Sequence, residues 1–171
     1  MIRPIALRLT LASAVASALF VSMALTTGCG GQPVGRICDL GVMPGSNESV
    51  VASPSLDCVS RTCLKVPLDP MAQLPPSNRY PTSTNGLCTD RCNSDGDCER
   101  VPESPCQSGF TCGIPVVVGP FCCEKFCICK DYIVIPDGGV PTPAACDPNT
   151  ATNSCCNLPG RSGNAQYPAC P

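Results

Sequence analysis

The sequence predicts a small, disulfide-rich fold that is mostly irregular, with short antiparallel β hairpins behind an N-terminal signal helix. The 171-residue chain contains 17 cysteines and 20 prolines, but no tryptophan, three tyrosines and four phenylalanines. Proline interrupts helices and central strands because it lacks an N–H donor. Because few aromatic side chains can be buried, disulfides are expected to replace part of the apolar core.

Residues 1–28 have the three-part layout of a secretory signal peptide. Arg3 and Arg8 form a short basic region, and Leu9 to Thr27 contain no charge and end beside a small residue. The alternative is a retained membrane anchor, because an apolar stretch of roughly 18 residues can just span a bilayer. Several serines and threonines dilute this stretch and no basic stop-transfer cluster follows it, so cleavage after residue 28 is predicted.

The end of this stretch, Leu25-Thr26-Thr27-Gly28-Cys29, resembles the lipobox of bacterial lipoprotein signals. In that family a small residue precedes the cysteine that is acylated and becomes the new N-terminus. Thr26 departs from the pattern, which has Leu, Val or Ile at this position. The resemblance implies a membrane attachment through lipid on Cys29. Gly30 after the cysteine is compatible, in the same family, with sorting to the outer membrane, so the implied location is the cell envelope.

The alternative for Cys29 is one more disulfide cysteine behind an ordinary cleavage site. Setting Cys29 aside leaves an even number of cysteines, which in an exported chain predicts up to eight disulfides. These sixteen are Cys38, Cys58, Cys63, Cys88, Cys92, Cys98, Cys106, Cys112, Cys122, Cys123, Cys127, Cys129, Cys146, Cys155, Cys156 and Cys170. Their pairing cannot be deduced from the sequence.

The cysteines divide the chain into three clusters. Residues 29–37 are expected to be a lipid-anchored tether and residues 38–63 the first cluster. A Pro-rich linker over 64–87 precedes a disulfide-rich β core over 88–135, and a second linker over 136–145 precedes the C-terminal cluster over 146–171. The first two clusters hold three and nine cysteines, so full oxidation requires a bridge between them or to the third. The last four cysteines can close on themselves.

A hairpin is predicted between Thr111 and Lys130. Thr111 to Val118 is apolar and β-branched, Gly119-Pro120 marks a turn, and Phe121 to Lys130 returns. Tyr132 to Ile135 is expected to add a third strand. In an extended strand, Cys122 and Cys123 would point to opposite faces and bond to two different layers. A direct bond between these neighbours is disfavoured by its geometry.

Charge and the absence of histidine exclude several function classes. Without the signal, nine basic residues face 13 carboxylates, which leaves no basic patch for nucleic acid. Without His, the chain has no Ser-His or Cys-His nucleophile pair and lacks the usual partner of cysteine in zinc sites. We therefore expect no catalytic residues, no metal and no cofactor.

An acidic segment around Gly96 is the one place where oxygen ligands gather. Asp90, Asp95, Asp97 and Glu99 suggest a calcium loop, but Arg91 occupies the position of its first ligand. The favoured interpretation is an acidic turn whose side chains accept backbone N–H groups.

Part of the cysteine pattern resembles the whey acidic, four-disulfide-core family, whose members often inhibit serine proteases. The matching positions are Cys88-x3-Cys92-x5-Cys98, the pair Cys122-Cys123, Cys127 and Cys129, while Cys106 and Cys112 depart from that pattern. The favoured function is a lipid-anchored structural or binding module with an unknown protein or envelope partner. A protease inhibitor is the alternative, and a secreted hydrolase with paired carboxylates is a further one.

Overall fold

The computed structural model describes residues 32–72, 84–150, 153 and 155–165, so the predicted signal helix and Cys29 lie outside the described residues. The elements are β1 (Ile37–Asp39), β2 (Val50–Ala52), β3 (Cys63–Lys65), β4 (Asn85–Cys88), η1 (Asp95–Asp97), β5 (Phe110–Gly113), β6 (Phe126–Cys129), η2 (Lys130–Tyr132) and η3 (Ala144–Cys146), where η is a 3-10 helix. These short antiparallel strands in a mostly irregular chain confirm the predicted fold class. Within the described ranges, no helix has the length and hydropathy needed to cross a membrane.

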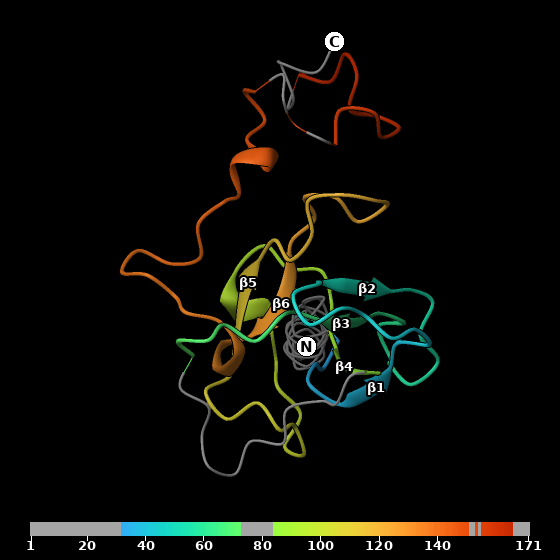
Figure 1. Cartoon of the computed structure of the whole chain (residues 1–171), viewed down its shortest axis with the longest axis vertical. Coiled ribbons are helices and arrows are strands. Elements are labelled where there is room, and N and C mark those ends of the chain that lie inside the picture. The colour runs from blue at the N-terminus through green and yellow to red at the C-terminus, as the bar shows by residue number, and fades with distance from the viewer. Residues whose placement is uncertain (1–31, 73–83, 151–152, 154, 166–171) are drawn as a thin grey trace, which may run out of the picture. The chain divides into compact units, whose positions relative to one another are not determined.

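A four-stranded antiparallel sheet with the order β1-β4-β3-β2 forms the first part of the fold (Figure 1). Neighbouring side chains on a strand point to opposite faces, and here the two faces have different chemistry. Leu64 and Leu87 join the larger hydrophobic cluster, whereas Cys63 and Cys88 join a second cluster made mainly of disulfides. The sheet is therefore covered on one face by apolar side chains and on the other by sulfur bridges.

Gly86 allows one of these bridges to cross the middle of the sheet. The Cys38–Cys63 disulfide joins β1 to β3, although β4 lies between them. A Cβ atom at Gly86 would lie 3.0 Å from the Cys63 Sγ and 2.6 Å from the Leu64 carbonyl oxygen. Because only glycine lacks that atom, it is the residue that fits beneath the bridge.

The second sheet is the hairpin of β5 and β6, which are paired over Phe110↔Cys129 to Gly113↔Phe126. The predicted hairpin is present, but its strands are shorter than expected, and Ile114-Pro115 follows β5 directly. Proline cannot donate to a ladder, which explains why pairing stops there. The third strand predicted over residues 132–135 is wrong: Tyr132 ends the 3-10 helix η2, and its ring is buried in the core.

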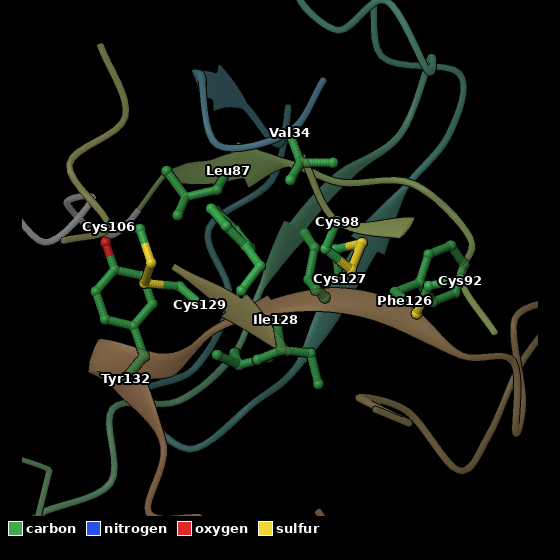
Figure 2. Close-up of a cluster of buried hydrophobic side chains, with 13 residues drawn as sticks. Val34, Leu87, Cys92, Cys98, Cys106, Phe126, Cys127, Ile128, Cys129 and Tyr132 are labelled. Carbon is green, nitrogen blue, oxygen red and sulfur yellow. A yellow bond between two sulfur atoms is a disulfide. The ribbon is translucent and has the colours of Figure 1, made fainter. Parts of the chain in front are cut away.

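One hydrophobic core joins the two sheets. It contains Leu64 and Leu87 from the first sheet and Phe110, Phe126 and Ile128 from the second, together with disulfides. Figure 2 shows this cluster around the Cys98–Cys127 and Cys106–Cys129 bridges. Phe126 is 1% exposed, and its ring meets Phe121 edge to face at a centroid distance of 6.0 Å. The two sheets therefore stabilise each other through shared apolar contacts.

The predicted linker over residues 64–87 requires a correction at both ends. It begins inside β3 and ends inside β4, and these two strands pair with each other. Pro67 and Pro70 lie in non-strand chain after β3, as the proline content predicts, and residues 73–83 lie outside the described residues. The segment is therefore a long connection between paired strands of one sheet, not a separator of two units.

The predicted tether over residues 29–37 is also too long. Val34 is fully buried, and its side chain belongs to the core (Figure 2). Its backbone N–H donates to the Glu99 carbonyl (2.8 Å), and its own carbonyl accepts from the Val101 N–H (2.9 Å). The folded body therefore includes the chain from Gln32 onward, and β1 follows almost at once.

Gly35→Ala is expected to loosen this N-terminal segment. Gly35 has φ +103°, and an added Cβ would overlap the buried Ser104 side chain and approach Phe110 to 2.9 Å. Backbone strain of about 1–2 kcal/mol would add to a packing penalty of about 1–3 kcal/mol, measured as lost free energy of unfolding. Gly139→Ala is the matched control, because Gly139 has φ +95° and no atom near the added Cβ. Equal losses in the two variants would contradict this packing.

Candidate functional site

Seven disulfides organise the described part of the chain. They are Cys38–Cys63, Cys58–Cys88, Cys92–Cys112, Cys98–Cys127, Cys106–Cys129, Cys122–Cys155 and Cys123–Cys146. Cys156 is disulfide-bonded too, so all fifteen cysteines within the described ranges are oxidised. Cys29 and Cys170 lie outside these ranges.

The bridges of the first two clusters interleave along the chain. Cys38–Cys63 and Cys58–Cys88 overlap in sequence, and the three bridges that start at Cys92, Cys98 and Cys106 pair first with fourth, second with fifth and third with sixth. Each covalent loop is thus crossed by another. When one such bridge is reduced, part of its loop therefore stays enclosed by the bridge that crosses it.

Cys58–Cys88 is the bridge between the first two clusters that the odd cysteine counts require. The expectation that the last cysteines close on themselves is wrong for Cys146 and Cys155, which bond to Cys123 and Cys122. The C-terminal cluster is therefore attached covalently to the β5–β6 loop.

Cys122 and Cys123 reach the C-terminal segment from a turn and not from a strand. The Cys122 N–H donates to the Gly119 carbonyl (3.1 Å), and Cys123 has φ +60°. In this geometry both side chains point toward the same segment, so the prediction of two different layers is wrong. The two sulfurs lie 4.0 Å apart and are not bonded to each other, as predicted.

Sulfur atoms gather in sets that resemble metal sites. Cys92, Cys98 and Cys127 are one such set, with sulfurs within 4.8 Å of one another. Zinc requires thiolates, whereas each of these cysteines is in a disulfide. While the disulfides are intact, these cysteines cannot ligate zinc. They act instead as covalent cross-links.

The acidic segment around Gly96 forms a turn that binds backbone N–H groups. One carboxylate oxygen of Asp97 accepts the N–H groups of Asn93 (2.7 Å) and Ser94 (2.9 Å). Asp90 accepts the N–H groups of Gln32 (3.0 Å) and Arg91 (2.9 Å). The structure therefore confirms the acidic-turn interpretation for these two carboxylates.

Asp95 connects this turn to the hairpin. Its carboxylate accepts the Cys112 N–H (2.8 Å) and the Thr111 hydroxyl (3.0 Å), and it pairs with Lys130 at 3.2 Å. The Cys112 N–H, followed by the Thr111 hydroxyl and Lys130, lowers the pKa of Asp95 below its ordinary value of 3.8, against a smaller opposing effect of burial. The side chain is 54% exposed, so its contribution to stability is below about 1 kcal/mol.

Asp95→Asn is expected to reduce the loss of unfolding free energy that accompanies a fall in pH. A carboxylate whose folded pKa is depressed stabilises the protein above its unfolded pKa, and this contribution disappears as the pH falls below 3.8 through the folded value. The variant should therefore be less stable at pH 7 and approach wild type near pH 2, measured by urea unfolding at each pH. A deficit that stays constant down to pH 2 would show that the ionised carboxylate is not the cause.

A buried carboxylate, Asp131, was not singled out from the sequence. Asp131 is 3% exposed and accepts the N–H groups of Gln107 (2.6 Å) and Ser108 (3.0 Å). It holds the loop that follows Cys106 against the end of the hairpin. Its hydrogen-bond donors are backbone N–H groups, and such contacts leave no recognisable pattern of residue types in the sequence.

An apolar groove of about 520 Å³ lies between the segment after β3 and the chain that follows η2. It is lined by the segment 66–70 after β3, by Ile133 and Val134, and by Ile114-Pro115. The Asp69 N–H donates to the Tyr132 carbonyl (2.9 Å) and holds the segment 66–70 against the end of η2. Apolar concavities with a few polar groups, here Asn47, Ser49 and Asp69, are typical of ligand sites.

Comparison of the chain with protein-family models, with curated proteins and with solved structures gave no match. The resemblances to lipoprotein signals and to four-disulfide-core domains therefore stay predictions. What the structure itself shows is a small domain stabilised by disulfides, of the kind found outside the cytosol.

Proposed function

We propose that this protein is a lipid-anchored, disulfide-stabilised structural or binding module of the cell envelope, attached to a membrane through Cys29. The complete oxidation of the fifteen described cysteines carries the proposal, because such bridges persist in oxidising compartments and are reduced in the cytosol. The apolar stretch before Cys29 supplies the export signal that this requires.

Attachment through lipid fits a body in whose described residues no helix is long and apolar enough to cross a membrane. A single acyl chain binds reversibly, whereas two or more chains make desorption negligible, since each buried methylene contributes about 0.8 kcal/mol. The groove beside Leu68 and Ile133 is the surface on which the binding hypothesis rests.

Cys29→Ser tests the proposal. In a Gram-negative host fed a labelled fatty acid, we expect the wild-type protein to be labelled and to sediment with membranes. The variant should lose the label and leave the membrane pellet after signal cleavage, or stay unprocessed. Thr26→Leu is the matched control, because it restores the usual lipobox residue and should be labelled at least as well as wild type. An unlabelled wild-type protein, or a labelled Cys29→Ser variant, would overturn the proposal.

A further inference from the structure

The folded body begins so close to Cys29 that it has little freedom above a membrane. Gln32 is held by its N–H bond to the Asp90 carboxylate (3.0 Å), and Val34 is buried in the core. Only Gly30 and Gly31 separate Cys29 from Gln32. Three Cα-to-Cα steps span at most about 11 Å.

This reach is short compared with the lipid surface itself. The headgroup layer of one leaflet is roughly 5–7 Å thick, and lipid on Cys29 would place that residue near its inner side. The remaining length, about 5 Å, is close to two water diameters. A body fixed at Gln32 can therefore be raised by no more than about 5 Å above the headgroups, which is too little for it to rotate freely above them.

We propose that one particular face of the body rests on the lipid headgroups of the membrane that holds it, an inference that depends on the proposed lipidation of Cys29. This anchor face consists of Pro33, Val59 and Val101, which together with Arg36, Asp57 and Cys88 line a depression of about 40 Å³. Pro33 is next to Gln32 in the chain, and the Val101 N–H bonds to the carbonyl of Val34. These residues therefore surround the point where the chain leaves the body toward Cys29.

The chemistry of the anchor face suits a lipid interface. Val59 is 66% exposed on a rigid loop, which the Cys58–Cys88 bridge and the Ser55 N–H bond to the Arg61 carbonyl (2.7 Å) hold in place. Arg36 and Asp57 line the same depression, and Arg36 is paired with Glu103 at 2.9 Å, so the face carries a polar group of each sign beside its apolar side chains. Amphipathic surfaces of this kind lie at the boundary between headgroups and acyl chains.

The absence of tryptophan from the chain makes a clean fluorescence test possible. The lipidated full-length protein carrying Val59→Trp is reconstituted into phosphatidylethanolamine and phosphatidylglycerol vesicles whose acyl chains are brominated near the headgroup. Val118→Trp is the matched control, because Val118 is also a valine, is 68% exposed and lies in the β5–β6 loop. We expect bromine to quench the Val59→Trp variant several-fold more than the Val118→Trp variant.

A third variant tests whether the short connection between Cys29 and Gln32 causes the difference in quenching. About 20 Gly and Ser residues inserted between Gly31 and Gln32 give a connection with an r.m.s. length of roughly 25 Å. This insertion should abolish the difference in quenching, while the protein still floats with the vesicles. Equal quenching of the two tryptophan variants in proteins that float would overturn the anchor face and leave lipidation standing. Failure of the wild-type protein to float would overturn lipidation and, with it, the anchor face.

Discussion

Complete reduction by excess thiol is expected to unfold the protein. Each disulfide contributes about 2–4 kcal/mol, mainly by restricting the unfolded chain. Since a typical domain is stable by only about 5–15 kcal/mol, loss of the seven bridges exceeds what the remaining apolar contacts can offset. The measurement is amide chemical-shift dispersion before and after reduction. A dispersed spectrum that survives full reduction would contradict the prediction.

Two bridges with similar loops provide an internal control for this effect. Cys98–Cys127 and Cys123–Cys146 close separations of 29 and 23 residues, so their loop entropies differ by only about 0.2 kcal/mol. Cys98 and Cys127 belong to the hydrophobic core, whereas Cys123 and Cys146 lie outside both clusters. Replacing the first pair with alanine should therefore cost clearly more unfolding free energy than replacing the second pair. Equal losses of unfolding free energy in the two variants would show that loop entropy alone sets the contribution of each disulfide.

Phe126→Ala is expected to cost about 3–5 kcal/mol of unfolding free energy, because it removes the largest fully buried side chain among the described residues. The ring contacts Phe121 edge to face, and the guanidinium of Arg91 lies 5.9 Å from its centroid. Both contacts disappear with the ring, and β6 loses the buried side chain at its first residue. The measurement is urea unfolding with the disulfides intact.

Val118→Ala is the surface control for this substitution. Its side chain is 68% exposed, so the change should stay within about 0.5 kcal/mol. A Phe126→Ala protein that unfolds at the same urea concentration as this control would contradict the position of Phe126 in the core.

The disulfide-rich class was predictable because it follows from composition, but the arrangement of the bridges was not. Cysteine content behind a predicted export signal implies oxidation, and the odd counts of the first two clusters imply a bridge such as Cys58–Cys88. The pairing of Cys122 and Cys123 depends on a turn with positive φ at Cys123. A non-glycine residue seldom adopts this conformation, so the sequence favoured a strand.

The four-stranded sheet escaped prediction because its strands are too short to show a period. Val50–Ala52 and Cys63–Lys65 have three residues each, whereas alternation is recognised over four or more. Val34 was assigned to the tether because it follows glycine and proline, although its burial is decided by partners that lie about 65 residues away in the chain, at Glu99 and Val101. Asp131 and the groove depend on similar long-range contacts.

Intact-mass analysis of the native protein, after alkylation without reduction in denaturant, tests the central claim most directly. We expect a chain that begins at Cys29, carries added acyl mass on that residue and takes up no alkyl group on the sixteen cysteines that follow. A chain that retains Met1, carries no acyl mass and is alkylated at many cysteines would contradict the account.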